Sequence, residues 1–205
     1  MNAAHDLIWE YSYGAVTVDA ICARARVKKG SFYYFFASKS ELASVAIESW
    51  WLERDAAMRE IFRKTVPPLD RIRNYLDFVA ERQLEGYRTA GHILGCPLHA
   101  LAAEICTQDE PLRSQLHGML NGLRAYVEQA VRDAQALGEI PGTDAKAKAN
   151  SLLAFYVGAL VQARISNDPD LVESMSRNGL ELLGAKPVPP VATLAETRPS
   201  LATLS

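Results

Sequence analysis

Hydrophobic residues recur every three or four positions along most of the chain, which is the spacing of amphipathic α-helices. Two short helices are expected between residues 17 and 39. The spacing, together with the proline and glycine breaks, predicts further helices over 3–12, 39–63, 69–87, 97–106, 112–137, 144–165 and 169–183. The sequence therefore predicts an all-α protein with about nine helices.

The segment from Thr17 to Lys39 has the pattern of two short helices joined by a tight turn. Thr17 is a favourable N-cap for the first of them. Five basic residues and no acidic residue lie between positions 24 and 39, although the whole chain carries a net charge of −2. A local positive field in an otherwise acidic protein indicates a polyanionic partner.

Aromatic residues distinguish this segment from an ordinary charged surface helix. We expect Phe32 and the Phe35-Phe36 pair to point into the protein, and Tyr33 and Tyr34 to present their hydroxyl groups to phosphates or base edges. A helix-turn-helix requires this division, because one helix crosses the DNA backbone and the next enters the major groove by its N-terminal end.

The run V-K-K-G-S-F-Y-Y-F-F-x-S-K-x-x-L, residues 27–42, resembles the DNA-binding domain of the TetR family of bacterial regulators, and the match covers about residues 5–50. The resemblance implies an all-helical homodimer that binds double-stranded operator DNA through a three-helix head. It implies that Thr17 and Val18 open the helix that crosses the backbone. It further implies DNA contacts from Lys28, Lys29, Gly30, Ser31 and Tyr33 on the recognition helix, and phosphate contacts from Tyr34 and Lys39.

The chain departs from the family pattern in two places. The turn usually carries glycine, whereas this chain has Arg26. If that position is left-handed, arginine costs about 1 kcal/mol relative to glycine. The chain also begins almost inside its first helix, so we expect a short or missing N-terminal arm.

The predicted domains are a helix-turn-helix DNA-binding domain at 1–47, a ligand-binding and dimerisation domain at 48–184, and a tail at 185–205. The tail contains four prolines and few large apolar residues, a composition typical of disorder.

The last two predicted helices are the expected dimer interface. The stretch SLLAFYVGALVQA, residues 151–163, is apolar nearly all round, and a monomer would leave much of that surface in water. Ala154, Gly158 and Ala159 would let another helix approach closely. Family members usually dimerise through these helices. The predicted interface residues are Leu153, Tyr156, Leu160, Leu171 and Met175.

Ligand-binding residues are expected in the helical body. Aromatic residues that could line an apolar cavity, or fill the core instead, are Trp50, Tyr75, Phe78, Tyr126 and Phe155. Cys96 precedes Pro97 and so lies at a predicted helix N-terminus, where the helix dipole stabilises a thiolate. His99 can approach the same helix face.

The segment GCPLHALAAEIC, residues 95–106, is similar to the body of a TetR-family subgroup whose members sense electrophiles and oxidants through a cysteine at the Cys96 position. That similarity favours a sensor thiol. The alternative is that Cys96 is a small packing residue.

The sequence lacks the motifs that are typical of membrane proteins, nucleotide-binding proteins and metal-binding proteins. The sequence has no apolar run of about 18 residues, no phosphate-binding glycine loop and no CxxC, so we expect no membrane span, cofactor or metal. Three scattered cysteines favour a reducing cytoplasm.

The predicted function is a DNA-binding transcriptional regulator, most simply a repressor that a small molecule or electrophile releases from its operator. Activation in place of repression stays open. The alternatives are a Cys/His enzyme that uses Cys96 and His99, and a helical scaffold without DNA binding.

Overall fold

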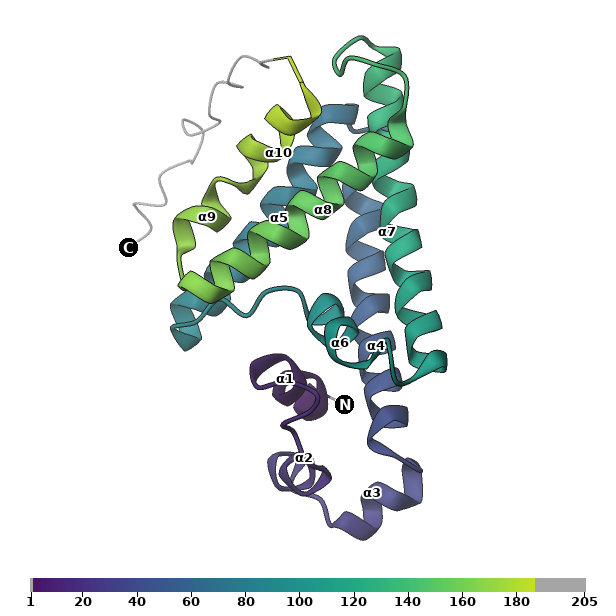
Figure 1. The fold of residues 1–205 in the computed structure, drawn as a ribbon, viewed down its shortest axis with the longest axis vertical. Helices are drawn as coiled ribbons and strands as arrows, with labels where there is room; N and C mark the ends of the chain where they lie inside the picture. The colour runs from purple at the N-terminus through teal and green to yellow at the C-terminus, as the bar shows by residue number, and fades with distance from the viewer. Residues whose placement is uncertain (1, 187–205) are drawn as a thin grey trace, which may run out of the picture.

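A computed structural model describes residues 2–186, with side chains from Asp6 onward. This part of the chain folds into ten α-helices and contains no strand, which confirms the all-α prediction (Figure 1). The helices are α1 (Asn2–Glu10), α2 (Val18–Ala25), α3 (Lys29–Phe35), α4 (Lys39–Ile61), α5 (Pro68–Ala90), α6 (Pro97–Ile105), α7 (Glu110–Ala136), α8 (Ala145–Ser166), α9 (Pro169–Glu173) and α10 (Met175–Leu183).

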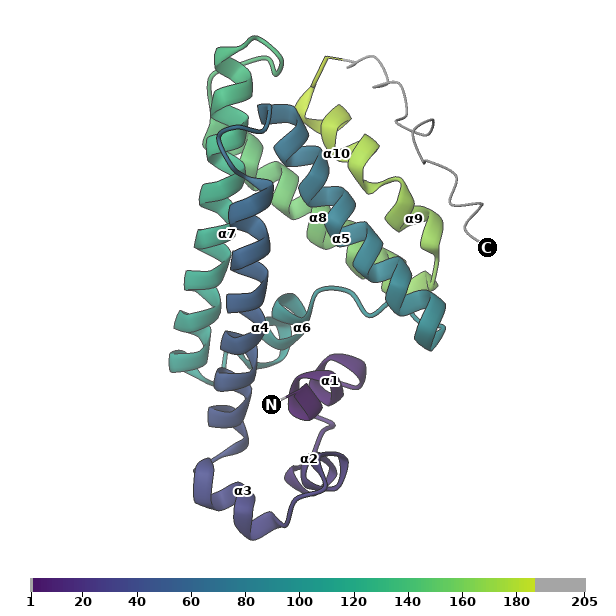
Figure 2. The same ribbon diagram turned by 180° about the vertical axis from the view of Figure 1, so that it is seen from behind.

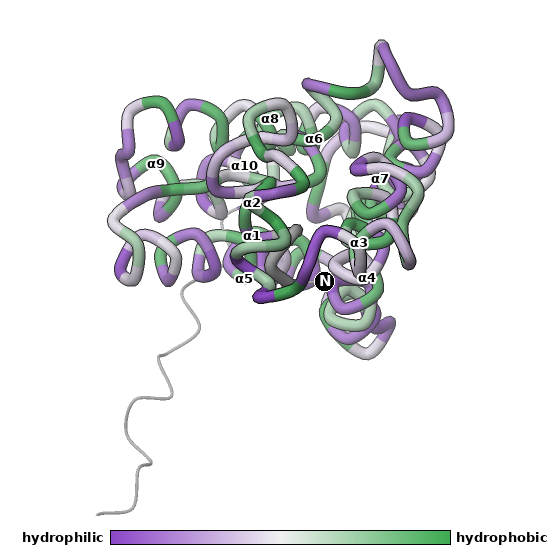
Figure 3. The backbone as a smooth tube through the Cα atoms, turned by 90° about the horizontal axis from the view of Figure 1, so that it is seen from below, coloured by the Kyte–Doolittle hydropathy of each residue, from purple (hydrophilic) through white to green (hydrophobic). Residues whose placement is uncertain are grey.

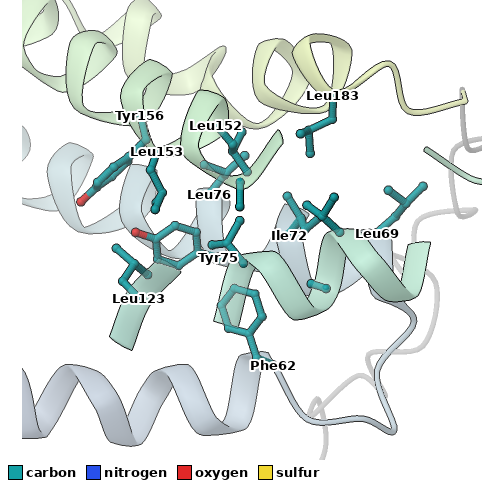
Figure 4. Close-up of a cluster of buried hydrophobic side chains, with 14 of the residues drawn as sticks. Phe62, Leu69, Ile72, Tyr75, Leu76, Leu123, Leu152, Leu153, Tyr156 and Leu183 are labelled. Atoms are coloured by element: carbon teal, nitrogen blue, oxygen red, sulfur yellow. The ribbon is translucent and has the colours of Figure 1, made fainter. Parts of the chain in front are cut away.

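The helices form a small head, α1–α3, at one end of an elongated body (Figures 1 and 2). Helix α4 runs from the head into the body, where it lies beside α7, and α6 lies between α1 and the body helices. Helices α5, α7, α8 and α10 enclose the largest hydrophobic core, and Figure 4 shows part of it. A second core joins α1, α4, α6 and α7.

Local sequence explains the turn inside the head. The Thr17 hydroxyl accepts a hydrogen bond from the Ala20 amide at 3.1 Å and so caps α2, as its position predicts. Arg26 ends α2 in the left-handed conformation, with φ 55° and ψ 41°. The turn therefore keeps its left-handed geometry without glycine, at a cost of about 1 kcal/mol.

One buried arginine fixes the turn between α4 and α5. Arg71 is 5% exposed, and its guanidinium donates to the carbonyls of Lys64 and Val66 and to the Asp133 carboxylate, 2.7 Å away on α7. Because every nitrogen has an acceptor, the charge can remain inside the fold.

Two details of the predictions are wrong. The last predicted helix is interrupted at Ser174, which gives the two helices α9 and α10, so the described residues contain ten helices where about nine are predicted. Phe35 does not point inward, because its side chain is 69% exposed, whereas Phe32 fills the head core and Phe36 packs against it.

No helix among residues 2–186 has the length and apolarity needed to cross a membrane. The predicted disordered tail, 185–205, lies outside the described residues except for its first two positions.

Candidate DNA-binding surface and sensor site

The N-terminal end of α3 is open to solvent, as a DNA-reading end requires. Lys28, Gly30 and Ser31 are exposed, and a Cβ added to Gly30 would meet no atom within 4 Å. Tyr33 and Tyr34 are 54% and 83% exposed. Figure 3 views the molecule from the head end, where a hydrophilic stretch leads into α3. The DNA contacts of these residues stay predictions.

Lys29 shares this surface but has an intramolecular partner. Its ammonium group lies 2.9 Å from the Asp19 carboxylate of α2, and both side chains are largely exposed. An exposed ion pair is screened by solvent and contributes little to stability. A phosphate can therefore replace Asp19 at little cost.

Lys39 connects α4 to the loop that follows α1. Its ammonium group donates to the carbonyls of Tyr13, at 2.8 Å, and Val16, at 2.9 Å, and lies 4.2 Å from the centre of the Tyr13 ring. An ammonium group has three N–H donors, so one remains for the predicted phosphate. Val18 is half-buried, and its side chain packs against the head core.

Most of the residues predicted at the dimer interface lie in the core of the single chain. Leu153, Tyr156, Leu160 and Met175 are at most 5% exposed in the single chain, because α5, α7 and α10 already cover them. They have no surface left to give to a second subunit, so the prediction is wrong for them. Leu171 is half-buried.

An apolar surface does exist on the other side of these helices. Val161 and Ile165 of α8 are 48% and 80% exposed, and Leu182 of α10 is 49% exposed. Gly158, one turn before Val161, has open space where a Cβ would lie. We call Gly158, Val161 and Ile165 the outer apolar face; Leu182 lies apart from it, because the end of α10 packs beside the N-terminal half of α8.

Cys96 is half-buried at the N-cap of α6 and lines a cavity of about 480 Å³. The sequence explains this position, because Pro97 suits the first turn of a helix and Gly95 adopts a positive φ of 75° just before it. The cavity lies between α6 and the C-terminal half of α8, and its lining includes Leu94, His99, Ala103, Val157, Val161 and Arg164. The predicted sensor pair thus shares one cavity wall.

The surroundings of Cys96 favour its thiolate. Burial of the thiol raises its pKa, but the His99 imidazole, followed by the Arg54 guanidinium and Tyr156, outweighs that effect and lowers the pKa of Cys96 to about 7. A thiol with this pKa is about half ionised at neutral pH.

Arg54 is the residue that sequence reasoning missed. It lies one turn after Trp50 and one turn before Met58, on the face of α4 that packs against the body. Its guanidinium carbon is 5.2 Å from the ring centres of both Trp50 and Phe78. The sequence does hold one signal for this position, because Arg54 is a charged residue within the predicted apolar face of α4.

The predicted ligand aromatics divide into two groups. Trp50, Tyr75 and Phe78 surround Arg54. The Tyr126 hydroxyl instead donates to Asp55 at 3.1 Å, while its ring packs on Phe62. Phe155 packs against the main core. The last two positions, Tyr126 and Phe155, therefore serve packing in this structure.

Hydrogen bonds connect the loop before Cys96 to the head. The Trp9 indole of α1 donates to the Gly95 carbonyl at 3.0 Å, and the Gln83 amide of α5 bonds both the carbonyl and the amide of Gly95 at 2.9 Å. At the other end of α6, the Glu104 carboxylate accepts from the amides of Tyr13 and Gly14. Helix α6 is thus bound to the head at both ends.

No group of three or more histidine, cysteine, aspartate or glutamate residues within positions 2–186 is arranged to hold a metal ion.

Comparison with known proteins agrees with this arrangement. The chain is 29% identical over 179 residues to the transcriptional regulator AcuR of Cereibacter sphaeroides, which covers 86% of this chain and 80% of AcuR. It is 28% identical over 176 residues to the transcriptional repressor NemR of Escherichia coli, covering 85% of this chain and 86% of NemR. The crystal structure of a TetR regulatory protein from Rhodobacter sphaeroides, 28% identical, matches with a TM-score of 0.78 over 88% of this chain and 95% of that one.

Two family models match the chain. The model of the bacterial regulatory proteins of the tetR family matches residues 1–46, and the model of the tetracyclin repressor-like C-terminal domain matches residues 68–178. These matches cover more than half of the chain, the head as well as the body. The chain belongs to the TetR family of bacterial transcriptional regulators.

Proposed function

We propose that this regulator is a homodimeric repressor, and that modification or occupation of the Cys96 site releases it from operator DNA. Repression is favoured over activation because the similar NemR of E. coli is a transcriptional repressor. The protein acts in the cytoplasm, where its DNA lies. The head at 1–47 binds DNA, and the body at 48–184 dimerises and receives the signal.

The observation that carries the proposal is the position of Gly95. Its carbonyl, one residue before the reactive thiol, accepts hydrogen bonds from Trp9 of the head and from Gln83 of the body. A group added to Cys96 occupies the cavity beside this loop and presses on Gly95 and Leu94, which line the same cavity. The Trp9 bond then weakens, and the head becomes free to take another orientation relative to the body.

The coupling is a difference in affinity between two conformations, and ligand and DNA need not touch. In a dimer, two recognition helices must lie about 34 to 36 Å apart to enter successive major grooves. A change in the angle of each head alters that spacing. The conformation that accepts the modified thiol therefore binds the operator more weakly.

The outer apolar face supports a homodimer. Gly158, Val161 and Ile165 follow one another along a single side of α8. Small and aliphatic residues at this spacing suit close packing between helices. The proposed dimer interface therefore lies on α8, one of the helices of the predicted interface, but it is formed by different residues.

The arrangement around His99 favours a sensor over the alternative of a Cys/His enzyme. A catalytic histidine needs a third group that orients its ring. The Nδ1 atom of His99 is buried and makes no hydrogen bond within residues 2–186. His99 can therefore activate the thiol for one modification, but it has no orienting partner for repeated turnover.

Fluorescence anisotropy with the intergenic DNA upstream of the protein's own gene tests the proposal. The unmodified protein should bind this DNA, and N-ethylmaleimide should release it. Failure of the unmodified protein to bind this DNA better than random duplex at physiological salt would contradict the operator part of the proposal.

A further inference from the structure

Arg26 occupies a turn position that suits glycine better than arginine. It ends α2 at φ 55° and ψ 41°, in the left-handed region that glycine enters freely and other residues enter at a cost. The turn itself is needed, because the amides of Arg26 and Val27 donate to carbonyls in the last turn of α2. Glycine would make the same two bonds, so the turn does not explain the arginine side chain.

The Arg26 side chain also has no role inside the fold. The other two non-glycine residues with a positive φ in the described part of the chain use their side chains locally. The Ser12 hydroxyl accepts a hydrogen bond from the Ala15 amide at 3.2 Å. The side-chain oxygen of Asn167 accepts one from the Ile93 amide at 3.0 Å. The side chain of Arg26, in contrast, is exposed and makes no hydrogen bond or ion pair with the described residues.

Arg26 and Lys28 are the cations of this turn that no acidic residue neutralises. Arg24 lies 3.3 Å from the Glu10 carboxylate, and Lys29 is paired with a carboxylate of α2. Neither Arg26 nor Lys28 has such a partner among the described residues. Two residues of chain separate their Cα atoms by at most about 7 Å. Positive charge that the protein leaves unneutralised attracts a polyanion.

We propose that Arg26 is a further DNA-binding residue, whose guanidinium binds a backbone phosphate at the edge of the major groove that α3 enters. A guanidinium presents paired N–H groups in one plane, which match two oxygens of a phosphodiester. A phosphate contact carries no base sequence, so Arg26 adds affinity for any duplex and helps to orient α3 in the groove. The inference rests on DNA binding by the head and does not depend on the Cys96 site.

The proposal explains why the turn carries a residue that its backbone disfavours. The cost of the left-handed conformation is present with and without DNA, whereas the phosphate contact forms only in the complex. Replacement of Arg26 by glycine should therefore change stability and DNA affinity in opposite directions. An arginine that only lies in solvent would change stability alone.

Arg26→Gly in the full-length protein separates the two effects. The midpoint of urea unfolding should rise, since glycine enters the left-handed region without the cost. Fluorescence anisotropy measures binding to the intergenic DNA and to a random duplex across a series of salt concentrations. For each head that makes the contact, affinity for both duplexes should fall about tenfold, and the slope of log affinity against log salt should fall by about one.

Two further variants identify the role of the charge. Arg26→Gln keeps the disfavoured turn and loses the charge, so it should lose the same affinity without becoming more stable. Arg26→Lys keeps the charge and loses the paired N–H groups, so it should keep the salt slope and bind with intermediate affinity. Arg132→Gln, an exposed position on α7, is the control with the same change of charge and should bind DNA as the wild type does.

Wild-type affinity with an unchanged salt slope in Arg26→Gly and Arg26→Gln would overturn the proposal. An equal loss of affinity in Arg132→Gln would also overturn it, because overall charge would then account for the effect. A wild-type protein that binds neither duplex would contradict the proposed function, and this inference with it. The two kinds of failure are therefore distinguishable.

Discussion

Trp9 and Gly95 lie 86 residues apart in the chain, and a 3.0 Å hydrogen bond joins the indole of one to the carbonyl of the other. Trp9 belongs to the head, and Gly95 precedes the thiol at the start of α6. In the proposed function, this bond connects a chemical event in the body to the orientation of the DNA-binding helices. It is the contact on which the proposed release depends.

Trp9→Phe should weaken the coupling between Cys96 and the operator. The variant loses one hydrogen bond, worth about 1 kcal/mol net, so the change in DNA affinity caused by N-ethylmaleimide should shrink about fivefold. Anisotropy titrations before and after modification measure this change. Tyr11→Phe, an exposed aromatic on the adjoining segment, is the matched control and should respond like the wild type.

Cys96 should react with iodoacetamide at a rate that rises with pH around a midpoint of about 7. An ordinary cysteine has a pKa of about 8.5, so its rate rises later. His99 lowers the pKa of Cys96. His99→Ala should therefore raise the midpoint and slow the reaction at pH 7. Peptide mass spectrometry resolves the three cysteines, and an unchanged midpoint in His99→Ala would rule out the imidazole as the activating group.

Lys28→Ala and Tyr33→Ala should weaken operator binding and leave the dimer intact. If Lys28 contacts a phosphate, its loss should also reduce the slope of log affinity against log salt by about one. Arg132→Ala, on the exposed side of α7, is a control of equal charge change. Affinity as low as that of Lys28→Ala in this control would show that overall charge, and not the head surface, attracts DNA.

Ile165→Glu should convert the dimer into monomers. A charge at Ile165, the most exposed residue of the outer apolar face, would be buried without a partner in a helix-to-helix contact. Light scattering after size exclusion gives the mass directly. Leu137→Glu alters another exposed aliphatic residue, the C-cap of α7, and should remain dimeric. A monomeric wild-type protein would contradict the proposal that two recognition helices of a dimer enter successive major grooves.

Asp133→Ala should destabilise the fold by about 3 kcal/mol, because it leaves the buried Arg71 charge without its carboxylate. Burial raises the pKa of Asp133, but Arg71 and Gln129 outweigh it and the net pKa is lowered. A lowered folded-state pKa gives stability that is present above the unfolded value of about 3.9 and is lost as pH falls through the folded value.

The advantage of the wild type over Asp133→Ala should therefore shrink only below about pH 4, as urea titrations can show. Glu128→Ala removes a surface partner of Arg132 and should cost less than about 1 kcal/mol.

Local signals in the sequence predicted much of the fold. Thr17 caps α2, and Arg26 occupies the left-handed turn position, because caps and turns depend on neighbouring residues. The inner residues of α8 were harder to place. The sequence of an apolar helix does not indicate which side its own chain covers, so the pattern predicts Tyr156 at the dimer interface although it lies in the core.

The site was predictable only in part, for a related reason. Cys96 and His99 are three residues apart on one helix, a relationship that periodicity reveals. Arg54 and Trp9 reach the same region from other helices. Their approach depends on how α4 and α1 pack against α6, which no local pattern encodes.

The most direct test of the central claim compares two quantities in the same samples of wild-type protein treated with increasing N-ethylmaleimide. One is the fraction of Cys96 modified, from intact-peptide mass spectrometry, and the other is the fraction of operator released, from anisotropy. The two fractions should rise together, and Cys96→Ser should stay bound throughout. Full modification of Cys96 with the operator still bound would contradict the account.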